Sequence, residues 1–174
     1  MAIAIALLGF ASTLVAIVLG AKLTERTTEK AESRRRADAE HTRKREVQAA
    51  ARLVHAELGL AGLLADSGAR DGSLVGMGLA PVDAWRAHAA LLAAELPDDV
   101  HAVVAETCTK LFAVVGGTAA LRTPAAAAVT ADQVREVVVP LIERIREAQI
   151  ALAEYAYPTG DGPALSFVPA RAGA

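Results

Sequence analysis

The side chains that could carry acid–base, nucleophilic or metal chemistry are few and scattered in this chain. There are four histidines and one cysteine. A metal site built on helices needs three or more ligands, with His or acidic side chains three or four residues apart. Asp38 with His41 and Asp98 with His101 have this spacing, but each pair offers only two ligands. We therefore expect no metal ion and no other cofactor.

His55 is the strongest candidate for covalent chemistry, because Glu57 follows it closely on a predicted helix. A histidine followed by an acid and a leucine near a membrane resembles the phospho-acceptor box of the sensor histidine kinases. The resemblance covers residues 53–58. It departs from the pattern because Glu57 stands two positions after the histidine, and Gly59-Leu60-Ala61 replaces the usual Arg-Thr-Pro. The resemblance implies a histidine phosphotransfer or sensor-output module, which requires an exposed imidazole at residue 55.

The remaining candidates have structural explanations. Cys108 falls on the apolar face of a predicted helix, where a buried thiol behaves as a small hydrophobic group. Asp98 and Asp99 are the only adjacent acids, and helix capping accounts for them. The glycine-rich residues 72–78 lack the Lys-Ser/Thr pair of a phosphate-binding loop. We expect no catalytic residues, and the chain is predicted not to be an enzyme.

The opening residues 2–21 carry no charge and are followed at once by Lys22. Twenty helical residues span about 30 Å, the thickness of the hydrocarbon layer of a bilayer. A cleaved signal peptide and a buried core helix are the alternatives. No basic residue precedes the apolar run, and that run is longer than the roughly 7–15 residues of a signal peptide. We expect residues 1–23 to form a single-pass transmembrane anchor in the lipid bilayer.

The orientation of the anchor follows from the basic residues near its ends, since basic loops stay in the cytoplasm. Only the C-terminal side carries them, and they are Lys22, Arg26, Lys30, Arg34, Arg35 and Arg36. We predict an N-terminus outside the cell membrane and a cytoplasmic C-terminal domain, with these six side chains contacting lipid head groups or setting the topology. The alternative is an inverted topology with an extracytoplasmic domain.

Small residues recur along one side of the predicted anchor, at alternating three- and four-residue steps. They are Ala6, Gly9, Thr13, Ala16 and Gly20. Such a face lets two helices approach closely in lipid, so a homo-oligomer is one expectation. The alternative is that an alanine- and glycine-rich span places small residues on every side.

Residues 24–46 are predicted to form a charged helical stalk. Residues 22–52 hold ten basic and six acidic side chains, or +4, whereas the whole chain is −2. This overall charge argues against a nucleic-acid partner. From Thr24 to Glu46 there is no Leu, Ile, Val, Met or aromatic residue, so packing cannot hold this helix. The pairs Glu32–Arg36 and Glu40–Lys44 have favourable i, i+4 spacing.

Residues 47–157 show the apolar spacing of a helical domain. The first helix should bury Val47, Ala50, Val54, Leu58, Ala61 and Ala65, with Leu53, Leu60 and Leu64 widening the buried face. It should end at residues 66–68, before a loop over residues 68–80. A second helix, with Trp85 as a core anchor, should run between Pro81 and Pro97.

A third helix should begin at Asp98 or Asp99 and be stopped or kinked at Gly116-Gly117. Thr130 and Gln133 have the spacing of a capping box, which starts a fourth helix with Pro140 as a kink. Its inward residues should be Val134, Val138, Leu141, Ile145, Ala148, Leu152 and Tyr155. Residues 158–174 are expected to be disordered.

These observations predict an all-α protein: one transmembrane helix, a helical stalk and a small antiparallel four-helix bundle. The predicted function is a non-catalytic interaction or scaffold module at the cytoplasmic membrane surface, with an unknown protein partner. The alternative is the phosphotransfer module that uses His55.

Overall fold

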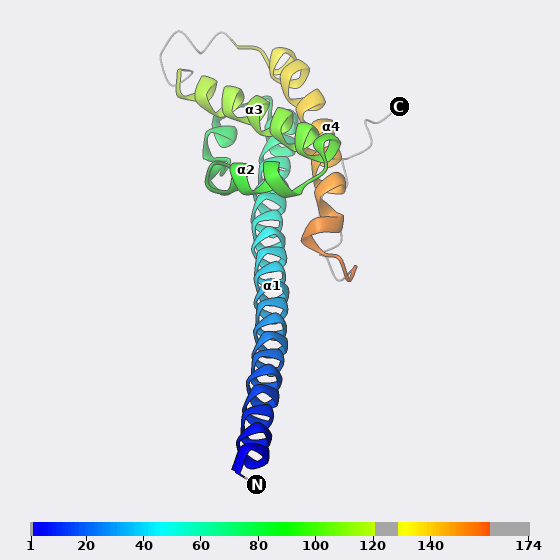
Figure 1. Cartoon of the computed structure of the whole chain (residues 1–174). Helices are drawn as coiled ribbons and strands as arrows, with labels where there is room; N and C mark the ends of the chain where they lie inside the picture. The colour runs from blue at the N-terminus through cyan, green and yellow to red at the C-terminus, as the bar shows by residue number, and fades with distance from the viewer. Residues whose placement is uncertain (1, 121–128, 161–174) are drawn as a thin grey trace. The chain divides into compact units, whose positions relative to one another are not determined.

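A computed structural model describes residues 2–120 and 129–160, with side chains over 28–74, 76–118 and 129–160. The elements are α1 (Ala2–Asp71), the 3₁₀ helix η1 (Val75–Leu79), α2 (Asp83–Glu95), α3 (Asp98–Ala120) and α4 (Ala131–Ala156). Four helices pack together, and the described residues contain no strand (Figure 1). The all-α prediction is confirmed. The predicted disorder of the tail lies outside the described residues from residue 161 onward.

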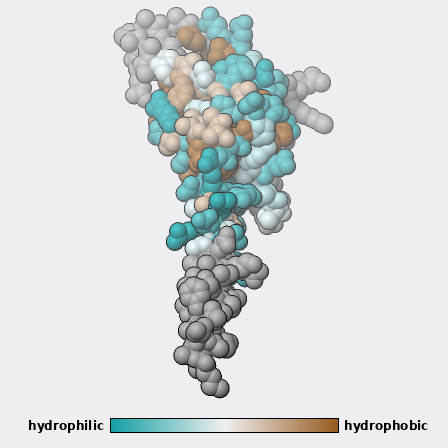
Figure 2. All heavy atoms as spheres, in the orientation of Figure 1, coloured by the Kyte–Doolittle hydropathy of each residue, from teal (hydrophilic) through white to brown (hydrophobic). Residues whose placement is uncertain are grey.

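The chain divides into two units, residues 1–44 and residues 45–174. In the first unit, every described side chain of α1, over residues 28–44, is exposed. Figure 2 shows that the described turns of α1 next to the grey N-terminal atoms are hydrophilic. The predicted pairs form, with 2.7 Å between Lys44 Nζ and Glu40 Oε1 and 3.8 Å between Arg36 and Glu32. The side chains of this stretch of helix therefore make ion pairs within the helix and do not pack into a core.

In the second unit, α1 buries one stripe of side chains, as the apolar spacing predicts. Ala50, Val54, Leu58, Ala61 and Ala65 are at most 1% exposed. The prediction that Leu53 and Leu60 widen this buried face is wrong, since they are 52% and 46% exposed. Each lies about 100° around the helix from its buried neighbour, beyond the side that the packed helices cover.

The prediction that the first domain helix ends at residues 66–68 is wrong, because the helix continues to Asp71. Gly72 follows with φ 63°, the left-handed conformation that glycine adopts without strain. Ser73 N donates to Gly68 O over 3.0 Å, which satisfies a carbonyl of the last turn in the manner of a Schellman motif. Ser67 Oγ also donates to Asp71 Oδ2 over 3.0 Å. The stop signal is therefore Gly72, and Gly68 is still helical.

The glycine-rich segment that the sequence predicts as a loop contains η1. Met77 in its centre is fully buried. A Cβ atom placed on Gly78 would lie 2.8 Å from Thr118 Oγ1, so the missing side chain allows close contact with α3. The loop prediction is wrong here because a 3₁₀ turn carries an apolar side chain into the core.

The α2 and α3 helices begin where the proline and aspartate residues predict. Trp85 and Leu92 are buried on α2, and Trp85 is 8% exposed, which confirms it as a core residue. Asp98 and Asp99 both occupy the first turn of α3. Gly116-Gly117 does not stop this helix, because a glycine in a helix costs only about 1 kcal/mol and does not forbid the conformation.

The α4 helix has the predicted capping box. Gln133 N donates to Thr130 Oγ1 over 3.3 Å, and Thr130 N donates to Gln133 Oε1 over 2.9 Å. Its buried face holds six of the seven predicted residues, and Tyr155 is partly buried. Pro140 stands inside a helix that continues to Ala156; the kink stays a prediction.

Among the described residues, Asp98–Thr118 in α3 is long and apolar enough to cross a membrane. However, α3 contacts α2, η1 and α4, and it carries the exposed charges Glu106 and Lys110. Of the apolar window in this helix, 22% is buried.

Candidate functional site

His55 lies where α1 packs against the last turns of α4. The imidazole is 5% exposed, and its ring meets the Tyr157 ring edge to face at 5.4 Å between centroids. Gln149 Nε2 donates to His55 O over 3.4 Å, and Arg52 Nε donates to Ala156 O over 2.8 Å. These contacts run antiparallel along the two helices. Burial lowers the pKa of His55 below its ordinary value, so the neutral imidazole is favoured.

This environment bears directly on the phosphotransfer interpretation. That interpretation needs an imidazole that a kinase or a receiver domain can reach. The structure instead places His55 under Tyr157 and between two helices. This burial disfavours a phospho-acceptor role for His55 and explains it as a packing residue.

Glu57 has a structural role that its spacing from His55 does not indicate. Its Oε1 accepts from Ala84 N over 2.8 Å, and its Oε2 accepts from Trp85 N over 3.3 Å. These are free backbone donors in the first turn of α2, where Val82 provides no side-chain cap. Glu57 therefore caps α2 from another helix.

Cys108 is 3% exposed on α3, as the apolar spacing predicts. Burial, with a smaller contribution from the negative charge of Glu57, raises the pKa of its thiol to about 12. The thiolate is the reactive form of cysteine, so this thiol is inert at neutral pH.

The other histidines lie on three different helices, with His41 on α1, His88 on α2 and His101 on α3. His101 stacks on Trp85 at 5.6 Å between ring centroids, and His41 is exposed on α1. Within the described ranges, no three His, Cys, Asp or Glu side chains gather as a metal site would require.

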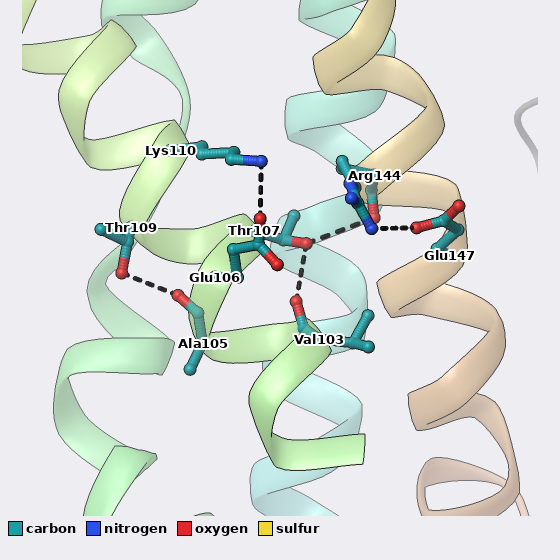
Figure 3. A network of polar contacts seen from close by, with 8 residues as sticks. All are labelled: Val103, Ala105, Glu106, Thr107, Thr109, Lys110, Arg144 and Glu147. Carbon is teal, nitrogen blue, oxygen red and sulfur yellow. Dashed lines mark hydrogen bonds and ion pairs between the residues drawn. The ribbon is translucent and has the colours of Figure 1, made fainter. Parts of the chain in front are cut away.

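An open groove of about 670 Å³ lies between α3 and α4. Val114, Val137 and Pro140 give it an apolar part, and Lys110 and Arg144 line its edge. Lys110 pairs with Glu106 over 2.7 Å, and Arg144 pairs with Glu147 over 2.9 Å (Figure 3). The basic groups at this edge therefore already have acidic partners on their own helices.

One buried polar side chain, Thr107, joins α3 to α4 beside this groove. Thr107 is 1% exposed, and its Oγ1 lies 2.8 Å from Val103 O and 3.3 Å from Arg144 O (Figure 3). Sequence reasoning missed Thr107 and Gln149, because both are polar residues on otherwise apolar stripes. Their spacing from the buried neighbours Val104 and Ile145 is the signal that could have found them.

The structure describes the side chains of only some of the residues predicted to lie in or near the membrane. Lys30, Arg34, Arg35 and Arg36 are exposed on α1. The side chains of Lys22 and Arg26, and those of the small-residue face Ala6, Gly9, Thr13, Ala16 and Gly20, lie outside the described side chains. The predictions made for them stand untested.

No protein-family model, curated protein or solved structure matches this chain.

Proposed function

We propose that this chain is a single-pass membrane protein whose helical domain acts as a non-catalytic interaction module at the cytoplasmic surface. The observation that carries the proposal is the uncharged stretch of residues 2–21 followed directly by a basic segment. The length of that stretch matches a bilayer, and its flanking charge sets an orientation.

The exposed helix over residues 28–44 supports this proposal. Lys30, Arg34, Arg35 and Arg36 are exposed, so anionic head groups can attract them by about 1 kcal/mol each near a membrane surface. A helix that is polar on all sides is suited to act as a solvated spacer.

The non-catalytic part of the proposal rests on the fate of the candidate side chains. His55 and Cys108 are both buried, and burial keeps the Cys108 thiol protonated at neutral pH. Glu57 is committed to the α2 backbone. What the domain does offer is helix surface, with an open groove and exposed leucines, which suits protein contact.

Membrane fractionation of the full chain, carrying a C-terminal reporter, tests the proposal. The protein should resist alkaline carbonate extraction, a fluorescent reporter should be active, and an alkaline phosphatase reporter should be inactive. Phe10→Arg should move the protein to the soluble fraction, since a central arginine costs about 2.5–3.5 kcal/mol on insertion scales.

Thr42→Arg is the matched control, because it adds the same charge to an exposed turn of α1. It should leave the membrane fraction unchanged. Recovery of the wild-type chain in the soluble fraction would overturn the anchor, and an active phosphatase reporter would overturn the orientation.

A further inference from the structure

Residues 45–71 of α1 leave a second apolar face uncovered. Leu53, Leu60 and Leu63 are 52%, 46% and 46% exposed, and Ala49 and Ala56 on the same side of the helix are also exposed. We call these five residues the outer leucine face. Exposed leucines scattered singly are ordinary, but a line of them on one helix calls for a covering surface.

The spacing of this face is that of a coiled coil. Its members follow one another at steps of four, three, four and three residues, which are the a and d positions of a heptad repeat. The exposed apolar residues of α4, which are Val137, Val139 and Ile150, follow no such repeat. The α1 helix therefore has one apolar stripe for its own domain and a second with the spacing that suits another helix.

One pair of charges beside the outer leucine face fits an identical helix in parallel orientation. Arg52 and Glu57 border the outer leucine face at g and e positions, five residues apart. In a parallel pair, g of one helix faces e of the next heptad on the other, so Arg52 meets Glu57 of the second copy.

Both side chains keep hydrogen-bonding capacity for this contact. Arg52 uses Nε for Ala156 O, and a guanidinium has five N–H donors in all. Glu57 accepts two backbone N–H groups, and a carboxylate offers about four lone-pair sites.

We infer that the outer leucine face is covered by the same face of a second copy of this chain, in a parallel two-fold pair. This inference rests on the proposed function, because copies anchored in one bilayer share an orientation. Five partly exposed side chains cover far less than the roughly 800 Å² per partner of a stable interface. The contact therefore depends on the anchor, which raises the effective concentration of the second copy.

Cysteine cross-linking of the full chain in native membranes tests the inference. Cys108 can remain, because it is buried and its thiol is inert. Leu53→Cys and Leu60→Cys should each form a disulfide-linked dimer under mild oxidation. Ala102→Cys, an exposed position on α3, is the matched control and should not. Adding Leu60→Asp to the Leu53→Cys variant should lower its dimer yield by about tenfold, since it places two carboxylates in the seam.

Orientation is read by co-expressing Leu53→Cys and Leu63→Cys chains that carry different tags. Ten helical residues span about 15 Å, so a parallel pair gives only same-site disulfides. A dominant mixed disulfide, or Leu60→Cys reacting no better than Ala102→Cys, would overturn the inference. Cross-linking only to a chain of another mass would also overturn it. Fractionation of the same sample separates the two failures: a soluble chain refutes the anchor, whereas a membrane-bound chain without the disulfides refutes only the pair.

Discussion

Two stretches of the same helix, residues 28–44 and residues 45–71 of α1, differ in the interactions that their side chains make. The first is exposed on every side and has ion pairs such as Lys44–Glu40 along its surface. The second places Val54, Leu58 and Ala61 in a core where they are fully covered. The comparison teaches that an unbroken helix need not have a uniform source of stability. The effect of a substitution should therefore depend on which stretch it enters.

The largest effect on the free energy of unfolding should come from removing a buried side chain of residues 45–71. Leu58→Ala should lower the free energy of unfolding by about 2–5 kcal/mol, because Leu58 is 1% exposed and its loss leaves a cavity. Urea unfolding of the full chain in dilute mild detergent measures it through Trp85, the only tryptophan, which is buried in this unit. Leu53→Ala, on the exposed side, should stay within about 0.5 kcal/mol of wild type. Equal losses for the two variants would break the comparison.

A smaller effect should separate two glutamates on the same helix. Glu57→Gln weakens the cap on α2 and should cost about 1 kcal/mol by the same assay. Glu40→Gln removes an exposed pair from the first stretch, so the Trp85 transition should not move. A shift of that transition in the Glu40 variant would mean that the exposed stretch contributes to the stability of the packed unit.

The smallest effect should be a pH dependence that originates at His55. Its pKa is lower in the folded state, so the unfolded chain takes up the proton first. The neutral imidazole contributes fully to the stability of the folded state above pH 6.5, its ordinary pKa. This contribution is lost as pH falls from 6.5 through the pKa of the folded state. His55→Gln should flatten the dependence of the free energy of unfolding on pH over that window. His41→Gln, at an exposed position, should leave this dependence unchanged. If the free energy of unfolding changed equally with pH in wild type and His55→Gln, His55 would not be the origin of the pH dependence.

Local signals were sufficient where a single element determines the outcome. The buried stripe of α4 and its Thr130–Gln133 capping box follow from spacing alone, because both are properties of one helix. The exposure of Leu53 and the cap that Glu57 gives to α2 could not be predicted in this way. Both depend on which sides of α1 other helices occupy, and periodicity within one helix does not contain that information.

The candidate chemistry shows the same limit. The sequence singles out His55 by its neighbours along the chain, whereas Tyr157, about a hundred residues later, is the group that covers it. Burial of Cys108 was predictable because its whole stripe is apolar. The end of α1 was misplaced because Ser67 and Gly68 resemble a stop, while Gly72 and Ser73 make the hydrogen-bonded one.

Gly72 has a consequence for how such a chain can vary. Its φ of 63° already disfavours side chains, and a Cβ there would lie 2.5 Å from Ala131 Cβ at the start of α4. Any replacement is thus opposed twice, once by its own torsion angle and once by a neighbour on another helix. Among divergent chains built on this plan, we expect position 72 to remain glycine while the leucines, valines and alanines around it interchange, so it would serve as a marker of descent.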